Sequence, residues 1–565
     1  MPDSRATPAV ALALVAIVLA ACALAASTWH VFGHTWDEPE HLAAGLSLLD
    51  HGRYDYDIQH PPLARLALAT GPYLAGARSQ GKPGPDGRPE GIAILYGSGH
   101  YDLYLTLARA GALPFLALLV LVAYLWARPL GGPAAGLLAA GFVATTPVLL
   151  GHGALADLDV PAAATCLLAL IAVQRWLARG RGRDALAMGL AGGIAVATKL
   201  SAIPFVGLGF IALAALARWQ GPAEPRHAPR LRTRIAGLAL AGLVAAVVLT
   251  LAYGGHFVYL TDAGHRYSQP LEYLFGHAGR LHDLAYAIAA RVPVPEAFQL
   301  IVGGIEALSW HNTIGHPSYL LGQVRTTGWW YFYLVALAVK SPLPLLALGV
   351  PGLALLAREG ARTRSAALLA PPVLFVALLA FSSLYSRINI GVRHVLVLYP
   401  LLATGAAVLT LKVWAWCQTA VPVGRARAAA LGLAALLGWQ AAALGYAWPD
   451  YLAYFNALAP EPRRVLIDSD LDWGQDLKRL SQRLAELKVP VISLAYLGTA
   501  DLPREHLPPY VLLGPDERAT GWVAVTALAR AHAPRRFDWL DAYPRRERIG
   551  PSIDLYYIAP RSASK

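Results

Sequence analysis

Residues 36–41, with the sequence WDEPEH, bring acidic and imidazole groups together in a pattern that could carry acid–base chemistry. If Pro39 lies in the first turn of a helix, where its missing N–H is tolerated, Asp37 and His41 are four residues apart and share one helix face. This spacing predicts a catalytic carboxylate with a partner. A structural alternative stays open, in which Asp37 is an N-cap and Glu38 lies in a first turn that favours negative charge.

Composition indicates that membrane helices must position these groups. The chain has 565 residues, of which 56% are hydrophobic and only 15% are charged. Apolar runs of about the twenty residues that span a bilayer recur up to residue 440. The net charge of +12 comes with Arg and Lys in short loops between these runs, which membrane topology explains better than a nucleic-acid partner does. The three cysteines lie in or beside apolar runs, so we expect neither a disulfide framework nor a Cys-based zinc site.

We predict about eleven membrane helices from these runs. They cover residues 9–27, 105–126, 134–150, 160–177, 185–198, 200–216, 235–253, 342–356, 366–384, 394–411 and 428–447. The first run could instead be a cleavable signal peptide, because it contains Ala23-Leu24-Ala25. Alternate loops are basic, as the positive-inside rule requires. An odd number of spans then places the N-terminus in the cytoplasm and the C-terminus outside.

The predicted fold class is an α-helical integral membrane protein with a small C-terminal α/β domain outside the membrane. Residues 1–447 form the membrane domain, and residues 448–565 form the extracytoplasmic α/β domain. The outer loops 28–104 and 254–341 are too long to be simple connectors, so we expect them to form the active site.

The C-terminal region shows a strand, helix, strand pattern. Residues 464–467 and 491–496 are strand-like, and residues 477–487 are typical of a helix. Asp472 and Gln475 fit a capping box at the start of that helix. The alternative for the acidic residues before it is a ligand or metal site at the strand ends.

The outer side combines acids with cations, which is what sugar transfer from a lipid phosphate needs. Such a reaction needs a base for the acceptor's proton and positive charge for the departing phosphate. Asp37 is the candidate base, and Lys199, Arg393 and less directly Lys340 are candidate phosphate partners. Each has a structural alternative: Lys199 could snorkel from a span end, and Arg393 could anchor a span. The histidines lack the spacing of a helical metal motif, so a divalent metal ion is an alternative that we do not favour.

The chain resembles the GT-C superfamily of membrane glycosyltransferases, specifically bacterial members of the protein mannosyltransferase-like group, family 39. Matching stretches run along the whole length: Trp36-Asp37-Glu38 with His41, His60-Pro61-Pro62-Leu63, Asp159-Val160-Pro161, Thr198-Lys199-Leu200-Ser201, Gly315-His316-Pro317-Ser318-Tyr319-Leu320, Gly328-Trp329-Trp330-Tyr331, Lys340-Ser341-Pro342, Ile390-Gly391-Val392-Arg393-His394, Tyr454-Phe455-Asn456 and Asp472-Trp473-Gly474-Gln475-Asp476-Leu477. Their order, and their expected placement on one membrane face, carry the resemblance.

The resemblance implies roles for individual residues. Asp37 is expected to be the base of an inverting displacement, with Glu38 beside it in a supporting catalytic or acceptor-binding role. The polyprenyl phosphate is expected to leave against Lys199 and Arg393, with Lys340 as a further candidate. We expect the remaining residues of these motifs to bind substrate: His41, His60, Asp159, His316 and His394.

Two departures limit the resemblance. Loop 254–341 is too short for the β-trefoil insertion of eukaryotic protein mannosyltransferases. The Trp-Trp-Asp signature of oligosaccharyltransferases is missing, because Tyr331 follows Trp330. We therefore expect transfer of a single sugar, with mannose as one candidate, from a polyprenyl-phosphate donor to a protein, lipid or glycan in the cell envelope.

Two other classes were weighed against this expectation. A multispan transporter or flippase of a lipid-linked substrate usually holds its ionisable residues near the bilayer midplane, often in two related halves. This chain has its charges at span ends and shows no evident repeat. A non-catalytic relative would have no need for both Asp37 and the cations. The expected location is a bacterial inner membrane, with the site outside.

Overall fold

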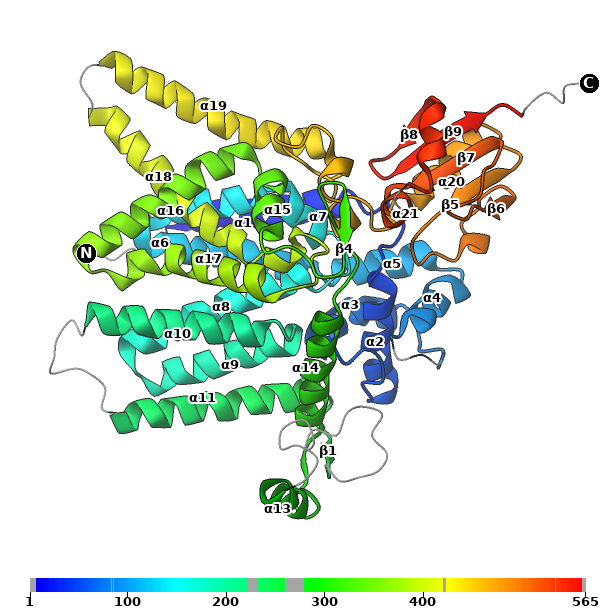
Figure 1. Ribbon diagram of the computed structural model, residues 1–565. Helices are drawn as coiled ribbons and strands as arrows, with labels where there is room; N and C mark the ends of the chain where they lie inside the picture. Colours follow the sequence, from blue (N-terminus) through cyan, green and yellow to red (C-terminus); the bar gives the residue numbers. More distant parts are fainter. Residues whose placement is uncertain are drawn as a thin grey trace, which may run out of the picture.

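The computed structural model describes residues 7–82, 84, 86–221, 231–259, 279–419, 423–533 and 535–560. Part of the predicted outer loop 254–341 therefore lies outside the described residues. Long apolar helices run side by side through most of the molecule (Figure 1). They are α1 (Pro8–Ala26), α6 (Leu113–Ala144), α8 (Asp159–Arg179), α9 (Gly182–Thr198), α10 (Ala202–Gln220), α11 (Leu231–Ala252), α16 (Leu343–Thr363), α17 (Ala366–Tyr385), α18 (Leu398–Thr419) and α19 (Val423–Ala447).

Nine helical stretches in the described part of the chain are long and apolar enough to cross a membrane. Helix α9 has the same character but only 17 residues, and α6 contains non-helical backbone at Gly131 and Gly132 that divides it in two. Counting α9 and both halves of α6 gives the predicted eleven segments. The membrane helix predicted over residues 394–411 begins four residues later, at Leu398 of α18. Residues Val392–Val395 before it form a 3₁₀ turn instead.

A layer of short elements covers one end of the helix bundle, where α2 and α14 lie across the ends of the long helices (Figure 1). The helices of this layer are α2 (Glu38–His51), α3 (Pro62–Leu74), α4 (Arg88–Gly97), α5 (Tyr101–Ala110), α7 (Pro147–Gly153), α13 (Arg280–Ala289), α14 (Glu296–Ile314), α15 (Phe332–Lys340) and the 3₁₀ turn η2 (Val392–Val395). Two small antiparallel ribbons join them: β1 (Phe257–Val258) with β2 (Val294–Pro295), and β3 (Ser318–Leu320) with β4 (Gln323–Arg325).

The C-terminal region forms a five-stranded mixed sheet at the same end of the bundle (Figure 1). Its strands lie in the order β6 (Tyr510–Leu512), β5 (Ile492–Ala495), β7 (Gly521–Thr526), β9 (Ile553–Ile558) and β8 (Arg545–Ile549), and its helices are α20 (Leu477–Glu486) and α21 (Ala527–His532). Strand β5 pairs in parallel with β6 and β7, whereas β9 pairs antiparallel with β7 and β8. Successive residues of β7 are buried on opposite faces: Ala524 packs with α20, and Val523 packs with Phe537. Covering both faces suits a sheet with a parallel core.

Two local predictions for this region are wrong. Residues 464–467 do not form a strand; Val465 C=O instead accepts a hydrogen bond from Leu321 N–H, so the segment docks against another loop. The capping box is also absent, because α20 begins at Leu477 and the Asp472 carboxylate accepts from Leu528 N–H and Gly474 N–H. The predicted helix and second strand are present as α20 and β5. The division at residue 447 stays a prediction.

Candidate active site

Asp37 lies directly before α2, with Pro39 in the first turn as the sequence predicted. Asp37 occupies the N-cap position and Glu38 lies in the first turn, but the Asp37 side chain makes no capping hydrogen bond. Instead Asp37 Oδ2 accepts a hydrogen bond of 2.8 Å from Arg393. The side chain remains 24% exposed, and Oδ1 has no hydrogen-bond partner among the described residues. Asp37 therefore keeps an oxygen that a substrate could reach.

Arg393 and Lys199 connect two carboxylates into a chain of alternating charge. Arg393 Nη1 also lies 3.5 Å from Asp159 Oδ2, and Lys199 Nζ donates to Asp159 Oδ1 at 2.5 Å. Asp159 begins α8, Lys199 follows α9 and Arg393 lies in η2, so three different elements meet here. We call Asp37, Arg393, Asp159 and Lys199 the charge chain. Two cations beside a partly exposed carboxylate are a suitable arrangement for binding a phosphate next to a base.

Arg393 also controls the acidity of Asp37. Burial raises the pKa of the Asp37 carboxyl, but the Arg393 guanidinium opposes burial and leaves that pKa below its usual range. The carboxyl is therefore ionised at neutral pH. Removing or redirecting Arg393 would make Asp37 a stronger base.

Glu38 has entirely different surroundings from Asp37. Arg109 donates to both of its oxygens, at 2.8 and 2.9 Å, and Ala156 N–H and Thr35 N–H donate at 2.8 and 2.7 Å. Its side chain is 1% exposed. Burial raises the pKa of Glu38, but the Arg109 guanidinium outweighs burial and holds it below the usual range. These contacts give Glu38 a supporting position beside Asp37, and its catalytic or acceptor-binding role stays a prediction.

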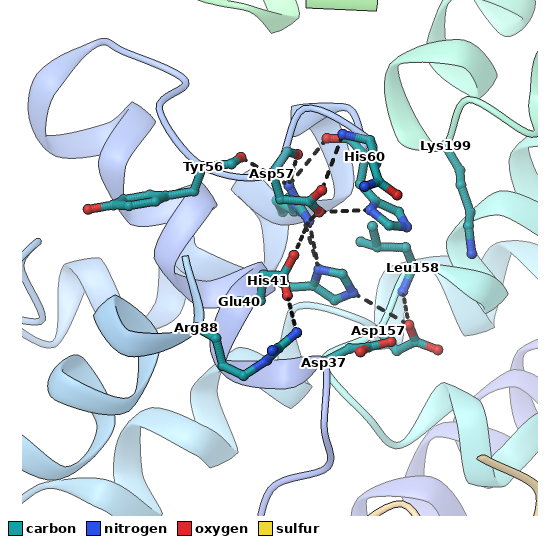
Figure 2. Close-up of polar contacts among 12 residues, drawn as sticks. Asp37, Glu40, His41, Tyr56, Asp57, His60, Arg88, Asp157, Leu158 and Lys199 are labelled. Carbon is teal, nitrogen blue, oxygen red and sulfur yellow. Dashed lines mark hydrogen bonds and ion pairs between the residues drawn. The ribbon is translucent and has the colours of Figure 1, made fainter. Parts of the chain in front are cut away.

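His41 lies between Arg65 and Asp157, and Figure 2 shows its ring facing Asp157. Arg65 donates to His41 Nδ1 at 3.2 Å, so that nitrogen carries no proton. Burial lowers the pKa of His41 to about 4, so the ring is neutral and its single proton belongs on Nε2. This Nε2–H faces Asp157 Oδ1 at 3.7 Å. His41 therefore supports the carboxylates beside it rather than taking up a proton.

The tautomer of His41 also bears on metal binding. Asp37, His41 and Asp157 each offer an atom within 4.8 Å of the others, which is a suitable spacing for ligands. Binding at His41 Nε2 would need a free lone pair on that nitrogen, and the Arg65 hydrogen bond places the proton there. The donor set therefore does not fit a metal held by His41, and a divalent metal ion stays the alternative that the sequence did not favour.

A second group of charges lies beside His41, where Figure 2 shows Asp57 and His60 close together. Arg65 is fully buried and pairs with Asp57, which also lies 2.8 Å from His60 Nδ1. The rings of His60 and His41 are 5.6 Å apart. Burial and the neighbouring Asp57 carboxylate raise the pKa of Glu40 to about 9, although Arg88 also donates to Glu40 Oε2 at 3.1 Å. His60 is thus adjacent to the charge chain, as expected, but is held by Asp57.

Lys340 does not belong to the charge chain. Its side chain is fully buried, and its amine donates to Leu452 C=O at 2.7 Å and Asp470 C=O at 2.6 Å. It also lies 4.3 Å from the centre of the Phe455 ring. These contacts connect α15 to the C-terminal region. The phosphate role of Lys340 stays a prediction.

The two remaining histidines lie beside the site without touching its carboxylates. His394 Nδ1 is 3.1 Å from Tyr333 Oη. His316 Nδ1 is 3.3 Å from His311 Nε2, and burial lowers the pKa of His316 to about 4 in an environment that includes Asp37 and Arg393. Their expected substrate contacts stay predictions.

Several site residues were not predicted from the sequence. Arg65 and Arg109 are both lone charges within apolar helical stretches, and both are fully buried. A buried arginine needs a carboxylate partner, so these isolated charges could have indicated the Asp57 and Glu38 pairs. Trp473 was part of a recognised motif, but nothing in the sequence indicated that its ring lies against Arg393.

Part of the chain matches a known family. Residues 107–253 match the family model described as dolichyl-phosphate-mannose-protein mannosyltransferase. This segment, about a quarter of the chain, is similar to the protein mannosyltransferase-like group of GT-C membrane glycosyltransferases. The matched segment runs from α5 to α11 and contains Asp159 and Lys199, whereas Asp37 and Arg393 lie outside it. No curated protein sequence matches the chain.

Solved structures that match the chain share little sequence with it. ArnT from Cupriavidus metallidurans bound to undecaprenyl phosphate is 14% identical over 99% of both chains, with a TM-score of 0.47. The archaeal oligosaccharyltransferase AglB from Archaeoglobus fulgidus, in complex with an inhibitory peptide and a dolichol-phosphate, is 13% identical, with a TM-score of 0.44. That match covers 90% of this chain but only 62% of the archaeal one. The S. cerevisiae protein O-mannosyltransferase Pmt1-Pmt2 complex is 17% identical over 49% of this chain and 38% of that chain, with a TM-score of 0.35. No residue role is transferred from these structures.

Proposed function

We propose that this protein is an inverting glycosyltransferase that uses a polyprenyl-phosphate sugar. It transfers one sugar, with mannose as one candidate, to a hydroxyl of a protein, lipid or glycan acceptor outside the cytoplasm. The expected location is a bacterial inner membrane, with the N-terminus in the cytoplasm and the charge chain on the outer side. The single observation that carries the proposal is the charge chain itself, in which a partly exposed carboxylate lies beside two cations.

The mechanism that we propose assigns one role to each member of the charge chain. The acceptor hydroxyl oxygen attacks the anomeric carbon of the donor while the bond from that carbon to the phosphate oxygen breaks. The bonding electron pair leaves with the polyprenyl phosphate, and Asp37 takes the hydroxyl proton. Lys199 and Arg393 stabilise the negative charge on the departing phosphate. No cofactor takes part in this scheme.

The shared position of Arg393 suggests how the base is activated. In the structure its Nη1 divides its hydrogen bonding between Asp37 and Asp159. A donor phosphate would compete with both carboxylates for this guanidinium, because Arg pairs well with phosphate. Once Arg393 turns toward the phosphate, the pKa of Asp37 rises and its basicity increases. Donor binding would then prepare the base for the acceptor.

The test is transfer of radiolabelled sugar from a panel of polyprenyl-phosphate donors, in membranes that contain the protein. The wild-type chain is compared with Asp37→Asn, which preserves shape and removes the base. Asp102→Asn is the matched control, since Asp102 is an exposed carboxylate on α5 whose partner is Lys478. Donor-dependent transfer by the wild type and the control, lost in Asp37→Asn at equal insertion, would support the proposal.

Two other outcomes contradict parts of it. Equal transfer by wild type and Asp37→Asn would remove Asp37 as the base. No transfer from any donor would reject the enzyme class and favour a transporter or flippase of a lipid-linked substrate.

A further inference from the structure

The C-terminal region reaches into the charge chain through one segment, residues 469–475, which we call the clamp. The clamp contacts Arg393 through Trp473: the guanidinium carbon of Arg393 lies 4.4 Å from the centre of the Trp473 ring. An arginine over a tryptophan face is held by electrostatic attraction to the ring. Trp473 itself is buried and packs with Leu155, Leu452 and Trp36, so its ring has little freedom to turn.

The clamp also fixes the backbone that leads into Arg393. Ser469 Oγ donates to Ile390 C=O at 2.6 Å, and Val392 N–H donates to Asp470 Oδ1 at 3.1 Å. The contact at Gly391 is so close that an added Cβ would lie 2.2 Å from Ser469 Oγ. The three residues directly before Arg393, residues 390–392, therefore all contact Ser469 or Asp470 of the clamp.

The other end of the clamp holds the backbone that leads into Asp37. Gly33 N–H donates to Gln475 C=O and Trp36 N–H donates to Trp473 C=O, both at 3.0 Å. The same short segment thus fixes the approach to both partners of the 2.8 Å bond between Arg393 and Asp37. Those two residues come from distant parts of the chain, and the clamp connects to each of them.

We propose that the clamp is part of the transfer site and that Trp473 is a positioning residue, which orients Arg393 between Asp37 and the donor phosphate. This inference rests on the proposed transferase function and assigns a task to the C-terminal region. A displacement of about 1 Å in a catalytic group can lower a rate about 100-fold. A folded protein in which Arg393 has lost the supporting Trp473 ring would therefore transfer sugar slowly.

The test compares two variants at Trp473 with a matched control. Trp473→Phe keeps an aromatic face, whereas Trp473→Leu keeps apolar bulk but removes the face. Trp522→Leu is the control, since Trp522 carries Arg546 at 4.9 Å within the C-terminal sheet and belongs to no part of the charge chain. We expect kcat per folded molecule to stay within about 10-fold of wild type for Trp473→Phe, and to fall about 100-fold for Trp473→Leu. Trp522→Leu should behave as wild type.

The pH profile separates positioning from general damage to the fold. Arg393, His41, Asp157, Asp468, Glu40 and His316 are the titratable or charged groups that act on Asp37. Among them, Arg393 holds the pKa of Asp37 down. If Trp473→Leu lets Arg393 swing away, the acidic limb of kcat/KM should move up by about 1 pH unit. Misfolding would lower the amount of active protein and leave the position of that limb unchanged.

Ser469→Ala provides a second, milder variant, because it removes the hydrogen bond to Ile390 and no buried ring. It should lower kcat with the same direction of pH shift. The inference is overturned if wild-type protein transfers sugar and both Trp473→Leu and Ser469→Ala keep its kcat and pH profile. A wild-type protein that transfers no sugar from any donor would instead reject the underlying function.

Discussion

Asp37 and Glu38 are adjacent in the sequence and both pair with an arginine, yet their surroundings are opposite. Glu38 receives two bonds from Arg109 and further bonds from backbone N–H groups, in a place that water does not reach. Asp37 receives one hydrogen bond from Arg393, and that arginine is shared with Asp159. The Glu38–Arg109 pair is buried and has its hydrogen bonds filled, whereas the Asp37–Arg393 pair is partly exposed and shares its arginine with Asp159.

This difference teaches how to separate structural from reactive carboxylates in one loop. A buried carboxylate with every acceptor position filled stabilises the fold only while its partner is present. A carboxylate with an unfilled oxygen and a partner that can be drawn to another anion is able to change its partners during a reaction.

The largest effect is expected at Asp37. Asp37→Asn should lower kcat about 100- to 10,000-fold, the range of general-base catalysis, while thermal stability changes little because the side chain has one partner. Steady-state transfer and a melting curve on the same purified protein measure both quantities. A large loss of stability with normal kcat in Asp37→Asn would show that Asp37, like Glu38, stabilises the fold and is not the base.

Glu38→Gln should show the opposite pattern. Removing the charge from a buried ion pair costs about 3–5 kcal/mol, so the free energy of unfolding should fall while kcat per folded molecule changes less than for Asp37→Asn. Because the folded pKa of Glu38 is lowered, its stabilisation is present above the unfolded pKa and is lost as pH falls through the folded pKa. Denaturation at neutral and acidic pH measures this, and a variant as stable as wild type at both would contradict it.

The two lysines extend the contrast to the donor phosphate. Lys199→Met should raise the donor KM about 10-fold or more, since a charge-assisted hydrogen bond contributes about 1.5–3 kcal/mol. Lys340→Met should lower the amount of folded protein, because two buried carbonyl groups lose their donor, and should leave the donor KM unchanged. Donor titrations at equal amounts of folded protein make the comparison. A donor KM that rises in Lys340→Met but not in Lys199→Met would support a phosphate-binding role for Lys340 instead of Lys199.

The smallest effect is on the pH profile of the wild type. Because the pKa of Asp37 lies below its usual range, kcat/KM of the free enzyme should stay level through mildly acidic pH and decline only below the usual range of a carboxyl group. Burial raises the pKa of the nearby Asp468 to about 7. An acidic limb near pH 7 would therefore assign the titration to Asp468 and remove it from Asp37.

The sequence predicted the membrane bundle, and its motifs include all four residues of the charge chain: Asp37, Asp159, Lys199 and Arg393. Each membrane helix is recognisable from the length of its own apolar run. The sequence could not show how the surroundings of Lys340 differ, since this residue has the same type and the same place at a helix end as Lys199. Only the carbonyl groups that surround its amine distinguish it from Lys199.

The fold class followed from the sequence alone because bilayer hydrocarbon demands long apolar helices, and hydropathy is a local property of the chain. The bond between Arg393 and Asp37 joins residues 356 positions apart, and Trp473 approaches that pair from a third region. Local patterns contain no information on such distances. Tertiary structure alone decided which carboxylate is closed, which is open, and which arginine lies between the site and the C-terminal sheet.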